Sequence, residues 1–222
     1  MGYFKRGFTL LLIITSVFFS VGCSQSAPEI MHGSIFLTVY EGEEGQNEER
    51  YSFFVLPRDD DGFGDLAELD LYNDNAGLSW KMTDADWVSY TDNGDTWIGT
   101  RAIAMSDNAS LPRGLFRAVI IDKGGERSEK TFSFDAPAVL PYAFPKFNWM
   151  PDTRTYKIES QYPENILLCY DEGGNFLSEL PVLIMEGNLN SLGLPPKAQA
   201  VELWARDSEQ SISALSKMVR VR

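Results

Sequence analysis

Apolar and polar residues alternate over short runs along most of the chain, and this alternation limits the possible folds more than any other feature. Alternate side chains of a β-strand share one face, so each run predicts a strand with one buried face. Gly, Pro, Asn or Asp bounds each run, and helical spacing is scarce. Short strands separated by turns predict an all-β sandwich or barrel, here a sandwich. The expected buried sets are Ile35, Leu37 and Val39; Phe53 and Val55; Ala67, Leu69 and Leu71; Leu78, Trp80 and Met82; Phe116, Ala118 and Ile120; and Phe132 and Phe134.

A proline-rich segment interrupts this pattern and predicts a boundary between two domains. Pro137, Pro141 and Pro145 lack the N–H that a strand ladder needs, and they stiffen the chain. We therefore expect one sandwich domain over residues 34–136, a linker over 137–145 and a second sandwich over 146–222. Each length is sufficient for a compact domain.

The two halves also share an order of motifs, which predicts a duplicated domain. Both LPRGLFRAVIIDKGGERSEKTFSF and LPPKAQAVELWARDSEQSISALSKMVRV contain Leu-Pro, a strand, an Asp-led turn and another strand. Asp122 and Asp207 would occupy the matching turns. Upstream, LDLYNDNAG and ILLCYDEGG correspond in the same way.

The N-terminal segment has the order of a secretory signal peptide. Lys5 and Arg6 precede an apolar run over residues 8–19, and small residues follow it. The run is shorter than the roughly 20 residues of a membrane-spanning helix. Residues 1–22 are therefore expected to be removed on export.

Cys23 follows Val21 and Gly22, and this junction resembles the lipobox of bacterial lipoproteins, although Ser20 stands where such motifs usually carry Leu. The resemblance implies a lipid on Cys23. Residues 23–33 would then form a short tether to a membrane, with the lipid as anchor and no spanning segment. The implied location is the bacterial cell envelope, facing the periplasm or exposed at the surface. The alternative is ordinary signal cleavage beside an incidental cysteine.

The last hairpin of each half resembles the F and G strands of immunoglobulin-like and fibronectin-III-like modules. LPRGLFRAVIIDKGGERSEKTFSF has the Gly-x-aromatic start and the Asp-led turn of that hairpin. The motifs ELDLYNDNAGLSWKM, TWIG and LPRG resemble uncharacterised spirochaetal lipoproteins with tandem domains of this kind. The resemblance implies two tandem immunoglobulin-like sandwiches, and it transfers no activity.

The acidic stretch RDDDGFGDLAELDLYND, residues 58–74, raises the question of a calcium site. Asp59, Asp61 and Asp65 are the candidate ligands. Pro57 falls on the first position of an EF-hand-like loop and offers no side-chain oxygen, and alternating, strand-like sequence lies on both sides. We expect a turn between the second and third strands, in which Gly62 and Gly64 allow positive φ, and no bound metal.

Trp87, Trp97 and Trp204 are the candidate binding residues, because exposed tryptophans are favoured at binding hot spots. Trp204 lies opposite the apolar face of Val201, Leu203 and Ala205, which favours an exposed or interdomain position. Filling of a sandwich core is the alternative, and it is stronger for Trp80.

No catalytic residues are predicted, and the chain is expected not to be an enzyme. The only histidine is His32, in the expected tether, so a Ser-His-Asp or Cys-His site lacks its base. Zinc-binding clusters and phosphate-binding loops are absent from the sequence. Cys169, in the apolar stretch ILLCYD, is expected to be a core residue. A hydrolase with a carboxylate pair stays open as a third hypothesis, because acids are numerous.

The charge balance disfavours two classes of partner. The whole chain has a net charge of −13, and loss of Lys5 and Arg6 from its 19 basic residues would leave 17 against 32 acidic ones, or −15. Such a chain disfavours nucleic acid and anionic lipid surfaces. The first hypothesis is therefore a non-catalytic, membrane-anchored envelope lipoprotein acting in display, protein interaction or envelope structure, without a cofactor. The second is a glycan-binding module that uses exposed tryptophans, with or without calcium.

Overall fold

The structure, a computed structural model, describes residues 26–42, 47–107, 109–137 and 142–222. Strands dominate this part of the chain, and its helical elements are the short 3₁₀ turns η2 (Phe63–Asp65) and η3 (Leu189–Leu192). The all-β sandwich fold is confirmed. The expected signal peptide and the lipidation candidate Cys23 lie outside the described residues.

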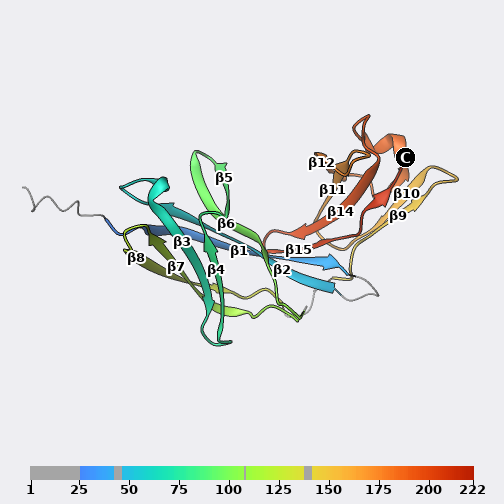
Figure 1. Ribbon diagram of the computed structural model, residues 1–222. Helices are drawn as coiled ribbons and strands as arrows, with labels where there is room; N and C mark the ends of the chain where they lie inside the picture. The colour runs from blue at the N-terminus through green and yellow to red at the C-terminus, as the bar shows by residue number, and fades with distance from the viewer. Residues whose placement is uncertain (1–25, 43–46, 108, 138–141) are drawn as a thin grey trace, which may run out of the picture.

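The first sandwich consists of two four-stranded layers (Figure 1). The order β1-β2-β6-β5 matches A-B-E-D of an immunoglobulin-like domain, and β4-β3-β7-β8 matches C′-C-F-G. The strands of the first layer are β1 (Glu29–Glu41), β2 (Asn47–Arg58), β5 (Val88–Asp92) and β6 (Asp95–Ile103). Those of the second are β3 (Leu66–Asn73), β4 (Leu78–Thr83), β7 (Gly114–Asp122) and β8 (Arg127–Phe134).

The second sandwich repeats this topology with a smaller first layer. The order β13-β10-β9 matches E-B-A, and β12-β11-β14-β15 matches C′-C-F-G. The small layer consists of β9 (Lys146–Met150), β10 (Thr155–Glu159) and β13 (Glu186–Asn188). The other contains β11 (Glu164–Tyr170), β12 (Phe176–Pro181), β14 (Ala200–Asp207) and β15 (Ile212–Leu215), and β16 (Val219–Arg220) pairs with β14.

Most residues of the predicted alternating sets face inward. Leu37, Phe53, Leu69, Phe116 and Ile120 are all buried in the first core. The remaining members are also buried, except Ala67, Leu78, Trp80 and Phe132, which are half-buried. The period-2 pattern therefore predicted which face of each strand is covered.

The repeat predicted from the sequence is also present. Asp122 ends β7 and Asp207 ends β14, the equivalent F strands, and both are buried. Asp122 Oδ1 accepts the backbone N–H of Glu126 (2.9 Å), and Asp207 Oδ1 accepts that of Glu209 (3.1 Å). Each aspartate thus stabilises the hairpin turn that follows it, as Asp side chains do by bonding to nearby backbone.

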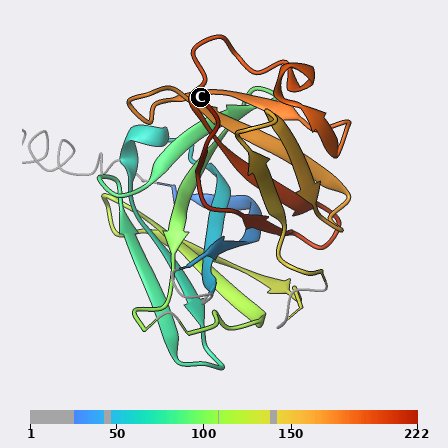
Figure 2. The same cartoon turned by 90° about the vertical axis from the view of Figure 1, so that its right-hand side faces the viewer.

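One sheet runs through both sandwiches. Strand β1 pairs in parallel with β15, so the first layer of the first sandwich continues into the larger layer of the second. Figure 2 shows the blue β1 and β2 between the green and yellow strands of the first half and the orange and red strands of the second. The two sandwiches therefore share backbone hydrogen bonds.

The two clusters of buried side chains do not coincide with the two halves of the chain. The first cluster includes Tyr162, Ala205, Ile212 and Ala214 from the second half, and Tyr142 and Phe144 pack against it. The second cluster contains Leu167, Val201, Leu203 and Cys169, and the expectation that Cys169 is a core residue is confirmed. The boundaries at residues 136 and 146 stay a prediction, but residues beyond them complete the first core.

Strand β1 begins at Glu29, so residues 29–33 of the expected tether belong to the ladder with β2. Ile30 is buried, and Lys130 donates from Nζ to the carbonyl oxygen of Ile30 (3.2 Å). Gly33 lies against the ring of Phe132, which would come within 2.8 Å of an added Cβ. These contacts hold a segment whose composition resembles a linker.

Candidate functional site

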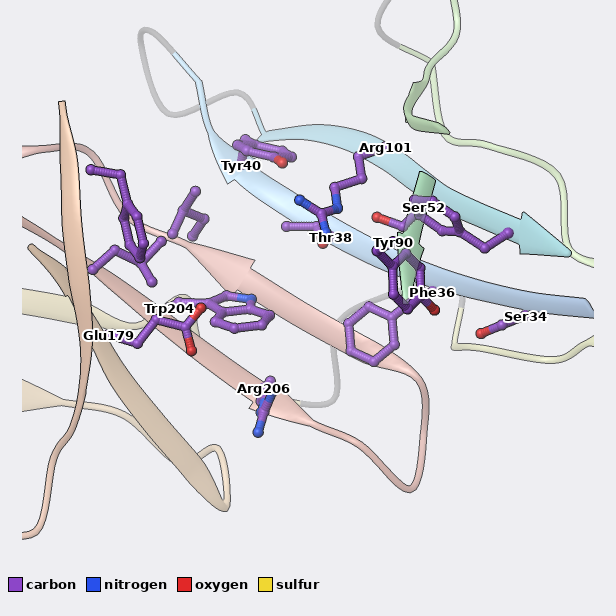
Figure 3. Close-up of a pocket in the computed structure, with 14 residues that line it drawn as sticks. Ser34, Phe36, Thr38, Tyr40, Ser52, Tyr90, Arg101, Glu179, Trp204 and Arg206 are labelled. Atoms are coloured by element: carbon purple, nitrogen blue, oxygen red, sulfur yellow. The ribbon is translucent and has the colours of Figure 1, made fainter. Parts of the chain in front are cut away.

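The outer face of the shared sheet contains a groove of about 600 Å³. It crosses the junction of β1 and β15, so both sandwiches line it (Figure 3). The lining residues from the first half are Ser34, Phe36, Thr38, Tyr40, Ser52, Phe54, Tyr90 and Arg101, and those from the second are Leu168, Phe176, Glu179, Trp204, Arg206 and Leu215.

Strand alternation explains why these side chains face outward. In β1, Ile35, Leu37 and Val39 are buried in the core, so Phe36 and Tyr40 point to the opposite face. In β14, the buried residues Val201, Leu203 and Ala205 leave the other face to Trp204 and Arg206. The groove is therefore the second face of strands whose first face makes the cores.

Trp204 is half-buried in the second-half wall of the groove. The guanidinium of Arg206 lies 4.9 Å from the centre of its ring, in a cation–π contact. Arg206 Nε donates to Glu164 Oε2 (2.6 Å), and the hydroxyl of Ser208 donates to the other oxygen of Glu164 (2.8 Å). The Ser208 bond and Arg206 together lower the pKa of Glu164. A charged carboxylate thus holds the arginine that covers part of the indole.

An aromatic stack forms the first-half wall. The ring of Tyr90 lies at 5.0 Å from that of Phe54 in an edge-to-face pair, and at 6.2 Å from Trp97 in a parallel pair. The Arg101 guanidinium lies 5.9 Å from the Phe54 ring centre. Such pairs fix ring orientation, because the negative ring face attracts positive edges and cations. The groove therefore has prepositioned aromatic surfaces on both sides.

The three predicted tryptophans do not converge on one site. Trp204 lines the groove, and Trp97 borders it through Tyr90. Trp87 packs on the first core instead, in the connection between β4 and β5. Trp80 is likewise packed on that core, as its alternation with Leu78 and Met82 indicated.

Sequence reasoning did not select Phe36, Phe54, Tyr90, Arg101 or Phe176. The outward positions of strands with buried partners were a usable signal for Phe36 and Phe54. For the others, the missing information was that β5, β6 and β12 belong to one sheet, which depends on the β1–β15 pairing.

The first part of the acidic stretch, residues 59–65, connects β2 to β3, the B and C strands, as predicted, and most of the rest forms β3. Gly62 has φ 96°, and Asp59 Oδ1 accepts the backbone N–H of Asp61 (2.9 Å). Asp61 Oδ2 accepts the N–H of Ser26 (3.0 Å), while the carbonyl oxygen of Asp65 accepts the N–H of Lys123 (2.8 Å). Within the described chain, no group of three or more His, Cys, Asp or Glu is placed to hold a metal ion. The carboxylates of Asp59 and Asp61 stabilise the turn.

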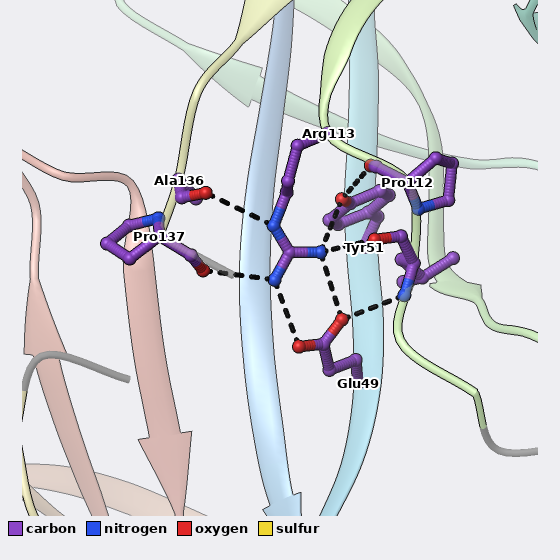
Figure 4. Close-up of polar contacts among 7 residues, drawn as sticks. Glu49, Tyr51, Pro112, Arg113, Ala136 and Pro137 are labelled. Atoms are coloured by element: carbon purple, nitrogen blue, oxygen red, sulfur yellow. Dashed lines mark hydrogen bonds and ion pairs between the residues drawn. The ribbon is translucent and has the colours of Figure 1, made fainter. Parts of the chain in front are cut away.

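Arg113 and Glu49 form an enclosed ion pair away from the groove (Figure 4). Nη1 and Nη2 of Arg113 each donate a hydrogen bond of 2.9 Å to the Glu49 carboxylate. The side chain of Arg113 is 16% exposed and that of Glu49 is 13% exposed. Arg113 also donates to the carbonyls of Ala136 and Pro137 (both 3.2 Å) and to the hydroxyl of Tyr51 (3.0 Å). Burial raises the pKa of Tyr51 to about 12. With all its donors engaged, this pair holds the end of the first sandwich in place.

The groove offers binding surface and little catalytic chemistry. Among its described lining residues, Glu179 supplies the one carboxylate, so the groove does not assemble the carboxylate pair of a glycoside hydrolase. His32 lies in β1 and does not line the groove. Over the residues with described structure, no helix is long and apolar enough to span a membrane.

The strand order and this groove define an all-β protein of two immunoglobulin-like sandwiches joined in one sheet. No family model matches the chain, and no curated protein matches it. Among solved structures, it is similar to dimeric latent PorU from Porphyromonas gingivalis, with a TM-score of 0.32, 18% identity and coverage of 89% of this chain and 20% of PorU.

It is also similar to Tp47, the 47-kilodalton lipoprotein of Treponema pallidum, with a TM-score of 0.40, 14% identity and coverage of 90% of this chain and 53% of Tp47. A third match is murine CEACAM1b, with a TM-score of 0.23, 12% identity and coverage of 86% of this chain and 99% of that one. This chain therefore spans a fifth of PorU and about half of Tp47.

Proposed function

We propose that this chain is a non-catalytic envelope lipoprotein, anchored by a lipid on Cys23, that binds a partner in the groove on the outer face of its shared sheet. The observation that carries the proposal is the aromatic lining of that groove by side chains from both sandwiches. A sheet face that served only as a solvated exterior would be mostly polar. Here Phe36, Tyr90, Phe176 and Trp204 line a single hollow.

The composition of the groove favours a protein segment as the partner. Tyr, Trp, Phe and Arg are the residue types enriched at protein interfaces, and all four types line this groove. Arg101 lines it and forms no ion pair within the described chain, whereas Arg206 is paired with Glu164, and the chain as a whole has a net charge of −13. We therefore expect a partner segment with apolar side chains and at least one acidic group.

A glycan is the second candidate, and Trp204 is the observation that favours it. Its half-buried indole shares the groove lining with Ser34, Thr38 and Ser52 on the first-half side, whose hydroxyl groups suit sugar hydroxyls. Calcium has no part in this version of the proposal, because Asp59, Asp61 and Asp65 lie in the β2–β3 connection and do not line the groove.

Site-specific photocrosslinking in the native cells tests the groove. A photoreactive residue at Phe176, which is 56% exposed in the groove, should give a defined crosslinked product. The matched control is Leu115 in β7, which is 53% exposed and does not line the groove. The same product from both positions, or none from Phe176, would contradict the proposal.

Metabolic labelling with palmitate tests the anchor. The label should be present in the wild-type chain and absent from Cys23→Ala, because the thiol of Cys23 is the proposed point of attachment. Cys169→Ala is the control, since that thiol is buried and should not affect labelling. A label that persists in Cys23→Ala would rule out lipidation at this residue.

A further inference from the structure

A second hollow lies at the far end of the second sandwich, and arginines dominate its lining. Its volume is about 590 Å³, and its lining residues are Trp149, Pro151, Arg154, Arg220, Val221 and Arg222. Figure 1 shows the C-terminal end of the chain beside β9 and β10, the elements that flank the 151–154 turn. The groove described above shares no lining residue with this hollow.

Two of the three guanidiniums have no partner within the described chain. The side chains of Arg154 and Arg220 form no hydrogen bond or ion pair there, and both are exposed. Arg222 is held by its own segment, because its NH1 donates to the carbonyl oxygens of Pro195 (3.3 Å), Pro196 (2.8 Å) and Ala198 (3.3 Å). These acceptors are neutral carbonyl oxygens, so they orient the guanidinium without neutralising its charge.

The local charge is opposite to that of the whole molecule. The lining side chains of the hollow include three arginines and no Asp or Glu, in a chain of net charge −13. Asp171 and Glu172 line a neighbouring hollow together with Arg220 and Arg222, but they form no ion pair with either. The carboxylate of Asp171 instead accepts hydrogen bonds from Asn175. Three like charges at one hollow repel one another, and a bound anion would relieve that repulsion.

Arg154 is held in an uncommon backbone conformation. Its φ is 53°, in the left-handed region that non-glycine residues seldom adopt. Its N–H donates to the carbonyl of Pro151 (3.2 Å), and its carbonyl accepts the N–H of Leu189 (2.9 Å). The surrounding turn therefore fixes the backbone from which this guanidinium projects.

Trp149 supplies an apolar surface beside the cations. It is half-buried and packs against the second core, so its ring is held from behind. The face of an indole carries negative charge density and attracts the slightly positive C–H groups of a ring-shaped ligand. Guanidinium groups in turn match the planar, two-oxygen geometry of a carboxylate.

We infer that this hollow binds an acidic saccharide, with the sugar ring against Trp149 and its carboxylate between Arg154 and Arg220. A carboxylated sugar can use both the aromatic face and the guanidinium groups, whereas an anion without a ring can use only the guanidinium groups. The site is separate from the groove, and this inference does not rest on the function proposed for the groove.

Calorimetric titration of the full chain tests the inference. The probes are oligogalacturonate, a neutral oligogalactoside of the same length, inorganic phosphate, and vesicles containing an anionic phospholipid. We expect binding of oligogalacturonate alone. The double variant Arg154→Asn/Arg220→Ala should weaken it by at least about tenfold, since charge-assisted hydrogen bonds are lost. Asn is chosen because it tolerates the left-handed backbone.

The matched control is Arg58→Ala/Arg127→Ala. This variant removes the same charge from two exposed arginines that do not line the hollow, and it should bind like the wild type. An equal loss in the control would show a general charge effect and overturn the inference. Equal binding of the neutral sugar, stronger binding of phosphate or vesicles, or no binding of oligogalacturonate would also overturn it. Trp204→Ala should bind oligogalacturonate normally, which separates this site from the groove.

Discussion

The backbone N–H of Leu37 in β1 donates a 2.9 Å hydrogen bond to the carbonyl of Ser211, the residue immediately before β15. This bond begins the parallel ladder that joins the two sandwiches, and Leu37 lies opposite Ile212 in its register. Both side chains are buried in the first core. The contact makes the shared sheet continuous, and with it the groove on the outer face.

Truncation of Ile212 should destabilise both halves together. Ile212→Ala removes a fully buried side chain from the first core and should cost about 2–5 kcal/mol in the free energy of unfolding. Hydrogen exchange followed by mass spectrometry should show faster exchange in β3 and β7 of the first half as well as in β14. Leu183→Ala, at a residue 92% exposed, is the control and should change little. Unchanged protection of β3 and β7 in Ile212→Ala would contradict a shared core.

The Arg113–Glu49 pair should matter far more than a comparable surface pair. Arg113→Met leaves the Glu49 carboxylate enclosed without its cation, which should cost about 3 kcal/mol. Arg117→Met is the control, because Arg117 pairs with Asp74 and Glu129, whose side chains are both 63% exposed. Its effect should be much smaller, since solvent screens such pairs. Urea unfolding measures both, and equal losses would show that enclosure of the pair is unimportant.

Buried tyrosines should make the fold sensitive to alkali. Burial raises the pKa of Tyr51 and that of Tyr162, each to about 12, from the ordinary value of 10.0. Between about pH 10 and about pH 12, these tyrosines have lost their protons in the unfolded chain but keep them in the folded chain. Unfolding is therefore favoured as the pH rises. Stability should therefore be complete below about pH 10 and fall progressively towards about pH 12.

The test is the urea midpoint measured across this pH window. Tyr51→Phe removes one of the tyrosines whose pKa is raised by burial, so its midpoint should fall less steeply with pH than that of the wild type. The slope of the curve, rather than the absolute midpoint, is the relevant quantity, because the variant also loses the hydrogen bond from Arg113. Identical slopes would show that Tyr51 does not titrate in this window.

Local patterns predicted much of this architecture, because strand alternation and turn chemistry depend on neighbouring residues. They placed Asp122 and Asp207 in equivalent turns, the 59–65 stretch between the B and C strands, and Trp204 opposite a buried face. The start of β1 at Glu29 was missed, since the segment EIMHGS contains polar and small residues typical of a tether.

The pairing of β1 with β15 could not be predicted in the same way. Its partners, such as Thr38 and Ser213, lie 175 positions apart, and a four-residue parallel ladder leaves no periodic signal that links them. The groove depends on that pairing, so its full lining was equally hidden. The Arg113 contacts were missed for the same reason, because Glu49 and Pro137 approach only in the folded chain.

Calcium should not bind the β2–β3 connection. One oxygen of Asp59 and one of Asp61 already accept backbone hydrogen bonds, and within the described residues no three acidic side chains converge there, whereas calcium needs six to eight oxygens. Calorimetric titration with calcium should give no heat beyond dilution. Heat that disappears in Asp61→Asn would instead show that the turn holds the ion.

The most direct test of the groove is the affinity of Trp204→Ala for the partner that is crosslinked at Phe176. Trp204 projects from the outer face of β14, so its truncation should weaken binding at least about tenfold while the unfolding midpoint changes little. Trp87→Ala is the matched control, because Trp87 packs on the first core and does not line the groove; it should lower stability and leave affinity unchanged. Wild-type affinity in Trp204→Ala, or an equal loss in Trp87→Ala, would contradict the central claim that this groove is the binding surface.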